Sequence, residues 1–116
     1  GSYRTAGMIV APCSMRTLSA IAGSVSDNLV TRAADVHLKE RRRLVLLARE
    51  TPLHLGHLRQ MVGATELGAI VMPPVPAFYR LPQSVAEIVD YLAARAIDLL
   101  DLPGLHLAPE WQGETR

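Results

Sequence analysis

Short apolar runs alternate with longer amphipathic stretches along this chain. Three runs, at 7–11, 44–48 and 69–72, contain no charged residue, and each is followed at once by proline or by a charged pair. Continuous apolar runs of this length are typical of strands that are buried on both faces of a parallel sheet. The sequence therefore predicts three short, buried strands at these positions.

The stretches between and after these runs have the period of amphipathic helices. Ser14, the stretch Ser26-Asp27-Asn28 and Ser84 each stand where a side chain can cap the first turn of a helix. These caps predict helices over about 14–23, from 26–28 to 40, and over 84–100. A further helix follows Pro52 over about 54–66, with Gly68 as the residue after its end.

The apolar positions of the last two helices predict which faces lie inward. In the helix over 54–66 the expected inward residues are Leu55, Leu58, Met61, Val62 and Leu67. In the helix over 84–100 the apolar stripe consists of Val85, Ile88, Val89, Leu92, Ala96, Leu99 and Leu100.

The order of the predicted elements, βα(α)βαβα, favours an α/β fold of the three-layer, Rossmann-like kind. Such a fold has a parallel sheet, helices on both faces and right-handed crossovers. Three strands make a thin sheet, and no phosphate-binding GxGxxG or GxxxxGK[ST] loop is present, so the amino-terminal strands of a doubly wound domain are missing. We expect one partial domain over 1–103 and a tail over 104–116.

Polar or unusual loops follow all three predicted strands, at 13–17, 49–53 and 73–82. The carboxyl ends of parallel strands share one edge of the sheet, where open α/β folds bind their ligands. Arg49 and Glu50, placed directly after the strongest strand, are the central candidates for chemistry. The pattern predicts a small-ligand site at this edge.

Composition limits the kind of protein. The 116 residues carry a net charge of +1, which argues against a nucleic-acid coat, and the basic run 41–43 is typical of a solvated helix end. A single cysteine excludes an internal disulfide and favours a cytoplasmic location. No apolar run approaches the ~18 residues of a membrane span, and no signal peptide is visible.

Three side chains allow a functional and a structural interpretation. Cys13, beside a helix N-terminus, is either an activated thiolate or inert packing. His54 and His57, three apart on a helix, are either two metal ligands or a capping pair, and no third ligand is evident.

Several cations allow a similar choice between ordinary surface charge and recognition of a phosphate. They are Arg32, Lys39, Arg49 and Arg95. The chain has no aspartate-rich metal motif, so a bound phosphate would be neutralised by side chains and not by a metal ion.

Five blocks of sequence closely resemble one family, the UbiX-like flavin prenyltransferases. The blocks are PCSMRTL at 12–18, DNLVTRAADV at 27–36, LKER at 38–41, RETPL at 49–53 and MPPVPAFY at 72–79. The resemblance covers about residues 1–100 and is to the carboxyl-terminal portion of the family. The family's first strand, its Gly/Ser-rich phosphate loop and an acidic site residue have no counterpart here.

The resemblance implies a metal-independent transferase. Family members move a dimethylallyl group from dimethylallyl monophosphate to reduced FMN, first at N5 and then at C6. The product, prenylated FMN, serves a UbiD-type decarboxylase in pathways such as ubiquinone biosynthesis. Members assemble as trimers and then dodecamers, with sites between subunits. We expect no nucleic-acid partner and no membrane span.

The resemblance also implies a role for individual residues. Flavin binding is assigned to Ser14, Met15, Arg16, Thr17 and Arg49, and the phosphate of the prenyl donor to Tyr79, Arg95, Lys39 and Arg32. Glu50, with Arg49, is the catalytic candidate and would move protons. Trp111 is a loosely matched aromatic of the tail.

Two alternatives to a flavin prenyltransferase stay open. One is an FMN-dependent decarboxylase of cysteine-derived carboxylates, which has the same fold. The other is a catalytically inactive fragment that only binds flavin or assembles, because the phosphate loop is missing.

Overall fold

Three parallel strands form the centre of the protein in the computed structural model, which describes residues 5–109. β1 (Gly7–Cys13) pairs with β2 (Arg43–Ala48), and β2 pairs with β3 (Ile70–Val71), so the order in the sheet is β1-β2-β3. The three predicted strands are confirmed. β3 is shorter than its apolar run, and β1 continues through Pro12 with an irregular register between Val10 and Cys13.

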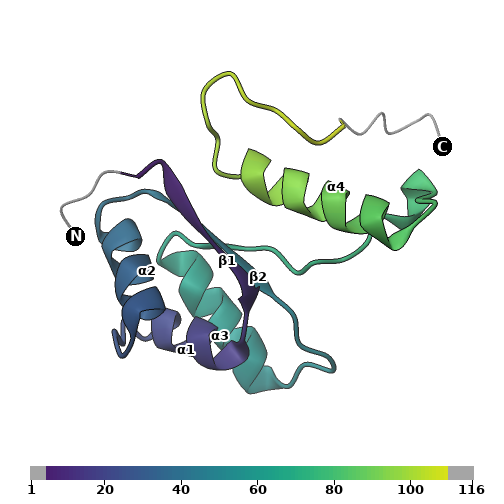
Figure 1. Cartoon of the computed structure of the whole chain (residues 1–116). Coiled ribbons are helices and arrows are strands. Elements are labelled where there is room, and N and C mark those ends of the chain that lie inside the picture. The colour runs from purple at the N-terminus through teal and green to yellow at the C-terminus, as the bar shows by residue number, and fades with distance from the viewer. Residues whose placement is uncertain (1–4, 110–116) are drawn as a thin grey trace.

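Helices cover both faces of this sheet, as predicted (Figure 1). α1 (Met15–Ala22), α2 (Leu29–Lys39) and α3 (Leu55–Glu66) lie together on one face. α4 (Val85–Asp98) lies across the other face, after a loop that contains the short 3-10 helix η1 (Phe78–Arg80). Among the described residues, no helix is long and apolar enough to cross a membrane.

Side-chain caps set where the helices begin. The Oγ atoms of Ser14 and Ser84 accept hydrogen bonds from backbone amides three residues ahead, both over 3.1 Å. Asn28 and Thr31 form a reciprocal capping box at the start of α2, in which the amide of Thr31 donates to Asn28 Oδ1 over 2.9 Å. These contacts satisfy amides that a helix leaves unpaired at its first turn.

The histidine pair caps α3. The amide of His57 donates to Nδ1 of His54 over 3.2 Å, the amide of His54 donates to Nδ1 of His57 over 3.3 Å, and the two rings stack 3.6 Å apart. The capping interpretation is confirmed. In the part of the chain that the structure describes, no group of three or more His, Cys, Asp or Glu side chains could hold a metal ion.

The main core lies between the sheet and α1–α3. It consists of Cys13, Met15, Leu18, Ile21, Ala34, Leu44, Leu46, Ala48, Ala64 and Ala69. The predicted inward face of α3 is wrong, because Leu55 and Val62 are each 57% exposed, and Leu58 and Leu67 are exposed as well.

Small residues decide which face of α3 lies inward. Ala64 is fully buried, and a Cβ atom on Gly63 would lie 3.5 Å from Cβ of Ala22 in α1. Close packing of the two helix backbones at this point turns the larger side chains of α3 outward, except the partly buried Met61.

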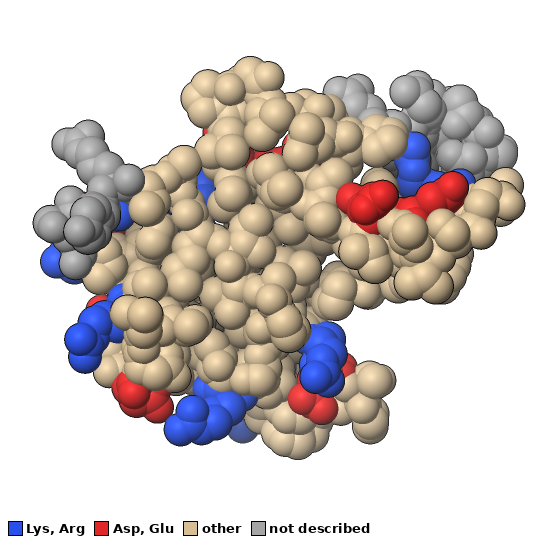
Figure 2. Space-filling model, viewed as in Figure 1, with Lys and Arg blue, Asp and Glu red and all other residues tan. Residues whose placement is uncertain are grey.

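α4 is attached to the rest of the molecule near its carboxyl end. A Cβ atom on Gly7 would lie only 2.8 Å from Cδ2 of Leu100, and Arg43 forms a 3.5 Å ion pair with Asp101. Val85 and Val89 of the predicted apolar stripe are 75% and 56% exposed. An open cleft therefore separates most of α4 from the sheet. Figure 2 shows charged side chains mainly around the periphery of this view.

The burial of β2 predicts a large effect of truncation there. Leu46→Ala should lower the free energy of unfolding by about 2–5 kcal/mol, because it removes a fully buried side chain from the central strand. Leu29→Ala is the matched control, at a position 82% exposed, and should change it by less than about 0.5 kcal/mol. Urea unfolding followed by circular dichroism measures both, and equal effects would contradict the proposed core.

Candidate functional site

The three strand ends meet, as predicted. One cleft of about 630 Å³ is lined by Pro12 near the end of β1, Arg49 after β2 and Pro74 after β3. The other walls of this cleft are apolar side chains of the sheet and of α4. The convergence of the strand-end loops at the carboxyl edge is thus confirmed.

The first turn of α1 lies at this edge because it follows β1 directly. Ser14 is exposed, and its Oγ lies 3.1 Å from Oγ1 of Thr17. Arg16 is exposed and forms a 3.4 Å ion pair with Asp27. The side chain of Met15 is buried in the core, so it does not face the edge of the sheet as a free side chain.

Arg49 and Glu50 follow the last residue of β2, and both are exposed. The strand brings this pair to the same edge of the sheet as the first turn of α1, because Ala48 pairs with Cys13. Arg32 lies in the first turn of α2, which the Arg16–Asp27 ion pair holds next to the start of α1.

Lys39 lies at the opposite edge of the sheet. It is the last residue of α2, four residues before β2 begins, and it lines a hollow with Leu67, which precedes β3. Within one chain, the structure therefore does not bring Lys39 to Arg49.

Tyr79 and Arg95 also lie apart from the strand ends. Tyr79 hydrogen-bonds Tyr91 of α4, and Arg95 follows Tyr91 by four residues, or about one helical turn. Tyr91 and Ala94 line a pocket of about 380 Å³ on the side of α4 that faces away from the sheet. The positions that line the sheet-side cleft, such as Val89 and Ala93, lie on the opposite face of the helix.

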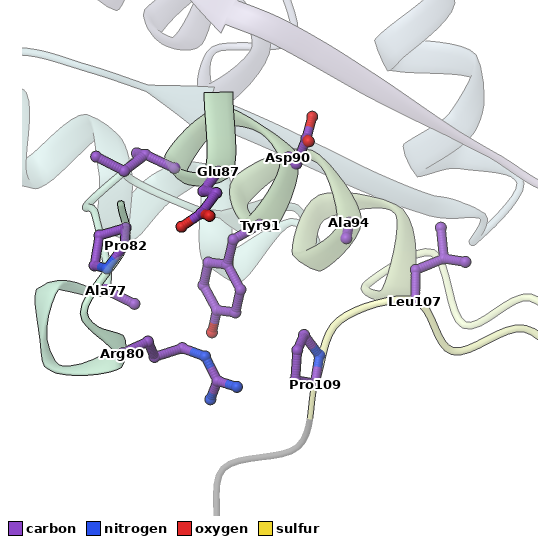
Figure 3. Close-up of a pocket in the computed structure, with 10 residues that line it drawn as sticks. Ala77, Arg80, Pro82, Glu87, Asp90, Tyr91, Ala94, Leu107 and Pro109 are labelled. Atoms are coloured by element: carbon purple, nitrogen blue, oxygen red, sulfur yellow. The ribbon is translucent and has the colours of Figure 1, made fainter. Parts of the chain in front are cut away.

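The outer pocket is lined by two residues that the sequence analysis missed, the cation Arg80 and the aromatic Tyr91 (Figure 3). The guanidinium carbon of Arg80 lies 5.6 Å from the ring centre of Tyr91, within the range of a cation–π contact. Burial raises the pKa of Tyr91, and the hydrogen bond to Tyr79 acts in the same direction. The scarcity of aromatic residues was the signal that could have identified Tyr91.

Asp98 is a further residue that the sequence analysis missed. Its Oδ1 accepts a hydrogen bond from the amide of Leu107 over 2.6 Å, and its Oδ2 accepts one from the amide of Ala108 over 2.7 Å. Nδ1 of His106 lies 3.5 Å from the same carboxylate. The bond from Ala108 is the main reason that the pKa of Asp98 is lowered. This carboxylate holds the segment that closes one side of the outer pocket.

Cys13 is not an activated nucleophile. Its side chain is fully buried, and its Sγ lies 3.6 Å from the carbonyl oxygen of Ser14, to which it donates. Burial raises the pKa of the thiol to about 11, which keeps it protonated at neutral pH. The packing interpretation is confirmed.

Comparisons with known proteins identify the class. The family model described as Flavoprotein matches residues 2–96. The chain belongs to the flavoprotein family, and its relatives include UbiX flavin prenyltransferases, to which it is similar. It is 58% identical over 114 residues to the flavin prenyltransferase UbiX of Salmonella typhimurium, and 56% identical over 115 residues to that of Escherichia coli K12.

Solved structures give the same result. AnUbiX (PadA1), crystallised in complex with FMN and dimethylallyl pyrophosphate, has a TM-score of 0.89 and 51% identity over 97% of this chain. A dodecameric FMN-dependent UbiX-like decarboxylase from Escherichia coli O157:H7 has a TM-score of 0.85 and 49% identity, also over 97% of this chain. The chain spans about 60% of the length of these relatives.

Trp111, the aromatic of the tail that the sequence analysis named, lies outside the described residues.

The hydrogen bonds that Asp98 accepts from the amides of Leu107 and Ala108 predict a pH-dependent change in the outer pocket. The pKa of Asp98 is lowered in the folded protein. The ionised carboxylate therefore stabilises the fold at pH values above the usual aspartate pKa, and this stabilisation is lost as the pH falls through the lowered pKa. Asp98→Asn should remove this dependence and speed hydrogen exchange at the amides of Leu107 and Ala108. Asp90→Asn, at an exposed position of the same helix, should leave both amides unchanged. Amide exchange at several pH values measures the difference.

Proposed function

We propose that this protein provides the carboxyl-terminal part of a flavin prenyltransferase. The reaction moves the dimethylallyl group of dimethylallyl monophosphate to N5 and then C6 of reduced FMN, and the product serves a UbiD-type decarboxylase. The observation that carries the proposal is the 58% identity to a flavin prenyltransferase over 97% of this chain. A further support is the meeting of the family's strand-end blocks at one edge of the sheet.

The flavin side of the site is assigned to the first turn of α1 and to Arg49. The amides of the first turn of a helix and a guanidinium suit an electron-rich, anionic ring system, such as the reduced flavin, because both donate hydrogen bonds toward negative charge. Glu50, next to Arg49 at the same edge, is assigned the proton transfers that accompany bond formation and the departure of phosphate.

The phosphate side of the site is assigned to Tyr79, Arg95, Arg32 and Lys39. As the allylic carbon–oxygen bond breaks, negative charge grows on the leaving phosphate, and fixed cations lower the energy of that transition state. In one chain Lys39 lies at the opposite edge from Arg49. Tyr79 hydrogen-bonds Tyr91, which lines the pocket on the outer side of α4. We therefore assign these side chains to sites that are completed by neighbouring subunits.

An assembly of several subunits agrees with the exposed surface of α3. Leu55, Leu58 and Val62 are apolar and exposed along one helix, which is typical of a surface covered by another chain. A relative with 49% identity is dodecameric. We propose a homo-oligomer in which the outer faces of α3 and α4 meet other copies.

Prenyl transfer can be tested with a chimera. The 116 residues, joined behind the amino-terminal part of the Salmonella typhimurium enzyme, are incubated anaerobically with reduced FMN and dimethylallyl monophosphate. Mass spectrometry should show a gain of one C5 unit on the flavin. A chimera that folds and binds FMN but forms no adduct would contradict the proposal and support an inactive flavin-binding protein. Turnover of a cysteinyl carboxylate would instead support the decarboxylase.

Substitutions test the assigned roles in the same chimera. Glu50→Gln should lower kcat by about 10²–10⁴, because it removes the group that moves protons but keeps the shape. Tyr79→Phe should mainly raise KM for the prenyl donor. Glu66→Gln, at the exposed end of α3, is the matched control and should leave both constants unchanged. Equal effects of Glu50→Gln and Glu66→Gln would contradict the role of Glu50.

A further inference from the structure

Tyr91 is the side chain at which the 3-10 helix η1 meets α4. Its ring projects from α4 into the outer pocket, and the guanidinium carbon of Arg80 in η1 lies 5.6 Å from the ring centre (Figure 3). Its hydroxyl is hydrogen-bonded to that of Tyr79, the residue before Arg80. Two neighbouring residues of η1 therefore contact one side chain of α4, by two different interactions.

The position of η1 depends on such side-chain contacts, because its own backbone is short. The amide of Arg80 donates to the carbonyl oxygen of Ala77 over 3.0 Å, and the amide of Leu81 donates to that of Phe78 over 2.9 Å. A single 3-10 turn with two hydrogen bonds is not stable by itself in water. Contacts with Tyr91 hold this turn against α4.

Tyr91 also lies beside Arg95, which follows it by four residues on the same face of α4. The positive charges of Arg80 and Arg95 act to lower the pKa of Tyr91, but burial and the hydrogen bond to Tyr79 outweigh them and raise it. The hydroxyl of Tyr91 therefore keeps its proton at neutral pH, and a protonated phenol can donate one hydrogen bond while it accepts another.

We propose that Tyr91 is a positioning residue, which holds the hydroxyl of Tyr79 at a fixed place relative to Arg95 for recognition of the prenyl-donor phosphate. This inference rests on the proposed function, to which the roles of Tyr79 and Arg95 belong. The ionised oxygens of a phosphate only accept hydrogen bonds, so Tyr79 must donate to them. Tyr91 is then the donor within the tyrosine pair, and Arg80 holds the Tyr91 ring in place.

The order from Tyr91 to Tyr79 to phosphate has two effects on binding. The side chain of Tyr79 is 49% exposed, and holding it in place before the donor arrives lowers the conformational entropy lost on binding. A hydroxyl that accepts one hydrogen bond also donates a stronger one. Both effects stabilise the bound donor and the transition state alike, so they change the dissociation constant and KM more than kcat.

Tyr91→Phe tests the hydroxyl alone, because it keeps the ring beside Arg80. In the chimera described above, calorimetric titration with oxidised FMN bound measures binding without transfer, since the proposed reaction needs reduced FMN. The Kd of dimethylallyl monophosphate should rise about 3–10-fold, as expected for one lost hydrogen bond. Under turnover KM should rise by the same factor, with kcat within about twofold.

Thr65→Val is the matched control. It also removes one hydroxyl from a helix, but this hydroxyl donates to the carbonyl oxygen of Met61 in α3 itself, over 2.8 Å. The substitution should change neither Kd nor KM.

A double-mutant cycle separates positioning from a general loss of structure. Where Tyr79 is already replaced by Phe, the further change Tyr91→Phe should raise Kd no more, because the hydroxyl that Tyr91 held is gone. A purely structural role of Tyr91 would instead give two independent, additive effects.

Hydrogen exchange of the full 116-residue chain gives a readout that needs neither flavin nor donor. Tyr91→Phe should speed exchange at the amides of Arg80 and Leu81, because η1 loses a contact with α4. The amide of Thr17, which donates to Ser14 Oγ at the start of α1 on the other face of the sheet, should exchange as before.

Three results would overturn the positioning role and leave the proposed function standing. They are an unchanged Kd in the Tyr91→Phe chimera, additive effects in the cycle, and unchanged exchange at Arg80 and Leu81. A chimera without substitutions that binds FMN but forms no adduct would instead contradict the proposed function, and the role of Tyr91 would fall with it.

Discussion

The burial of β2 between two parallel neighbours is the constraint on which the rest of this structure depends. Leu44, Val45 and Leu46 are fully buried, and successive side chains of a strand point to opposite faces. Both faces of the sheet must therefore be covered, one by α1–α3 and the other on the side of α4. The same strand ends at the carboxyl edge of the sheet, where Arg49 and Glu50 follow it. The strand that is buried most completely therefore also positions the candidate site.

The two layers of helices are not equally complete. On the side of α1–α3, small residues such as Ala64 and Gly63 let the helices pack closely, and the core there is continuous. On the other side α4 is held mainly near its end, by Leu100 and by the ion pair of Asp101 with Arg43, and an apolar cleft stays open. The face of the sheet under α4 is therefore less fully covered than the face under α1–α3.

The candidate site residues are divided among three regions of one chain. Arg49 lies at the carboxyl edge and Lys39 at the amino edge. Tyr79 lies in η1, hydrogen-bonded to Tyr91 on the outer side of α4. A single copy cannot surround one small ligand with all three. The division agrees with the proposal that neighbouring subunits complete the site.

By itself the sequence determined the order of elements, their caps, the parallel sheet and the meeting of the strand-end loops, since periodicity, capping and chain direction are local properties. Tertiary structure decided which helix faces are buried: Leu29 is 82% exposed while Thr31 and His37 are buried. It also decided that Tyr79 meets Tyr91 and that Asp98 holds the tail. These contacts depend on where separate elements come to rest against one another, which close packing settles and hydrophobic periodicity does not.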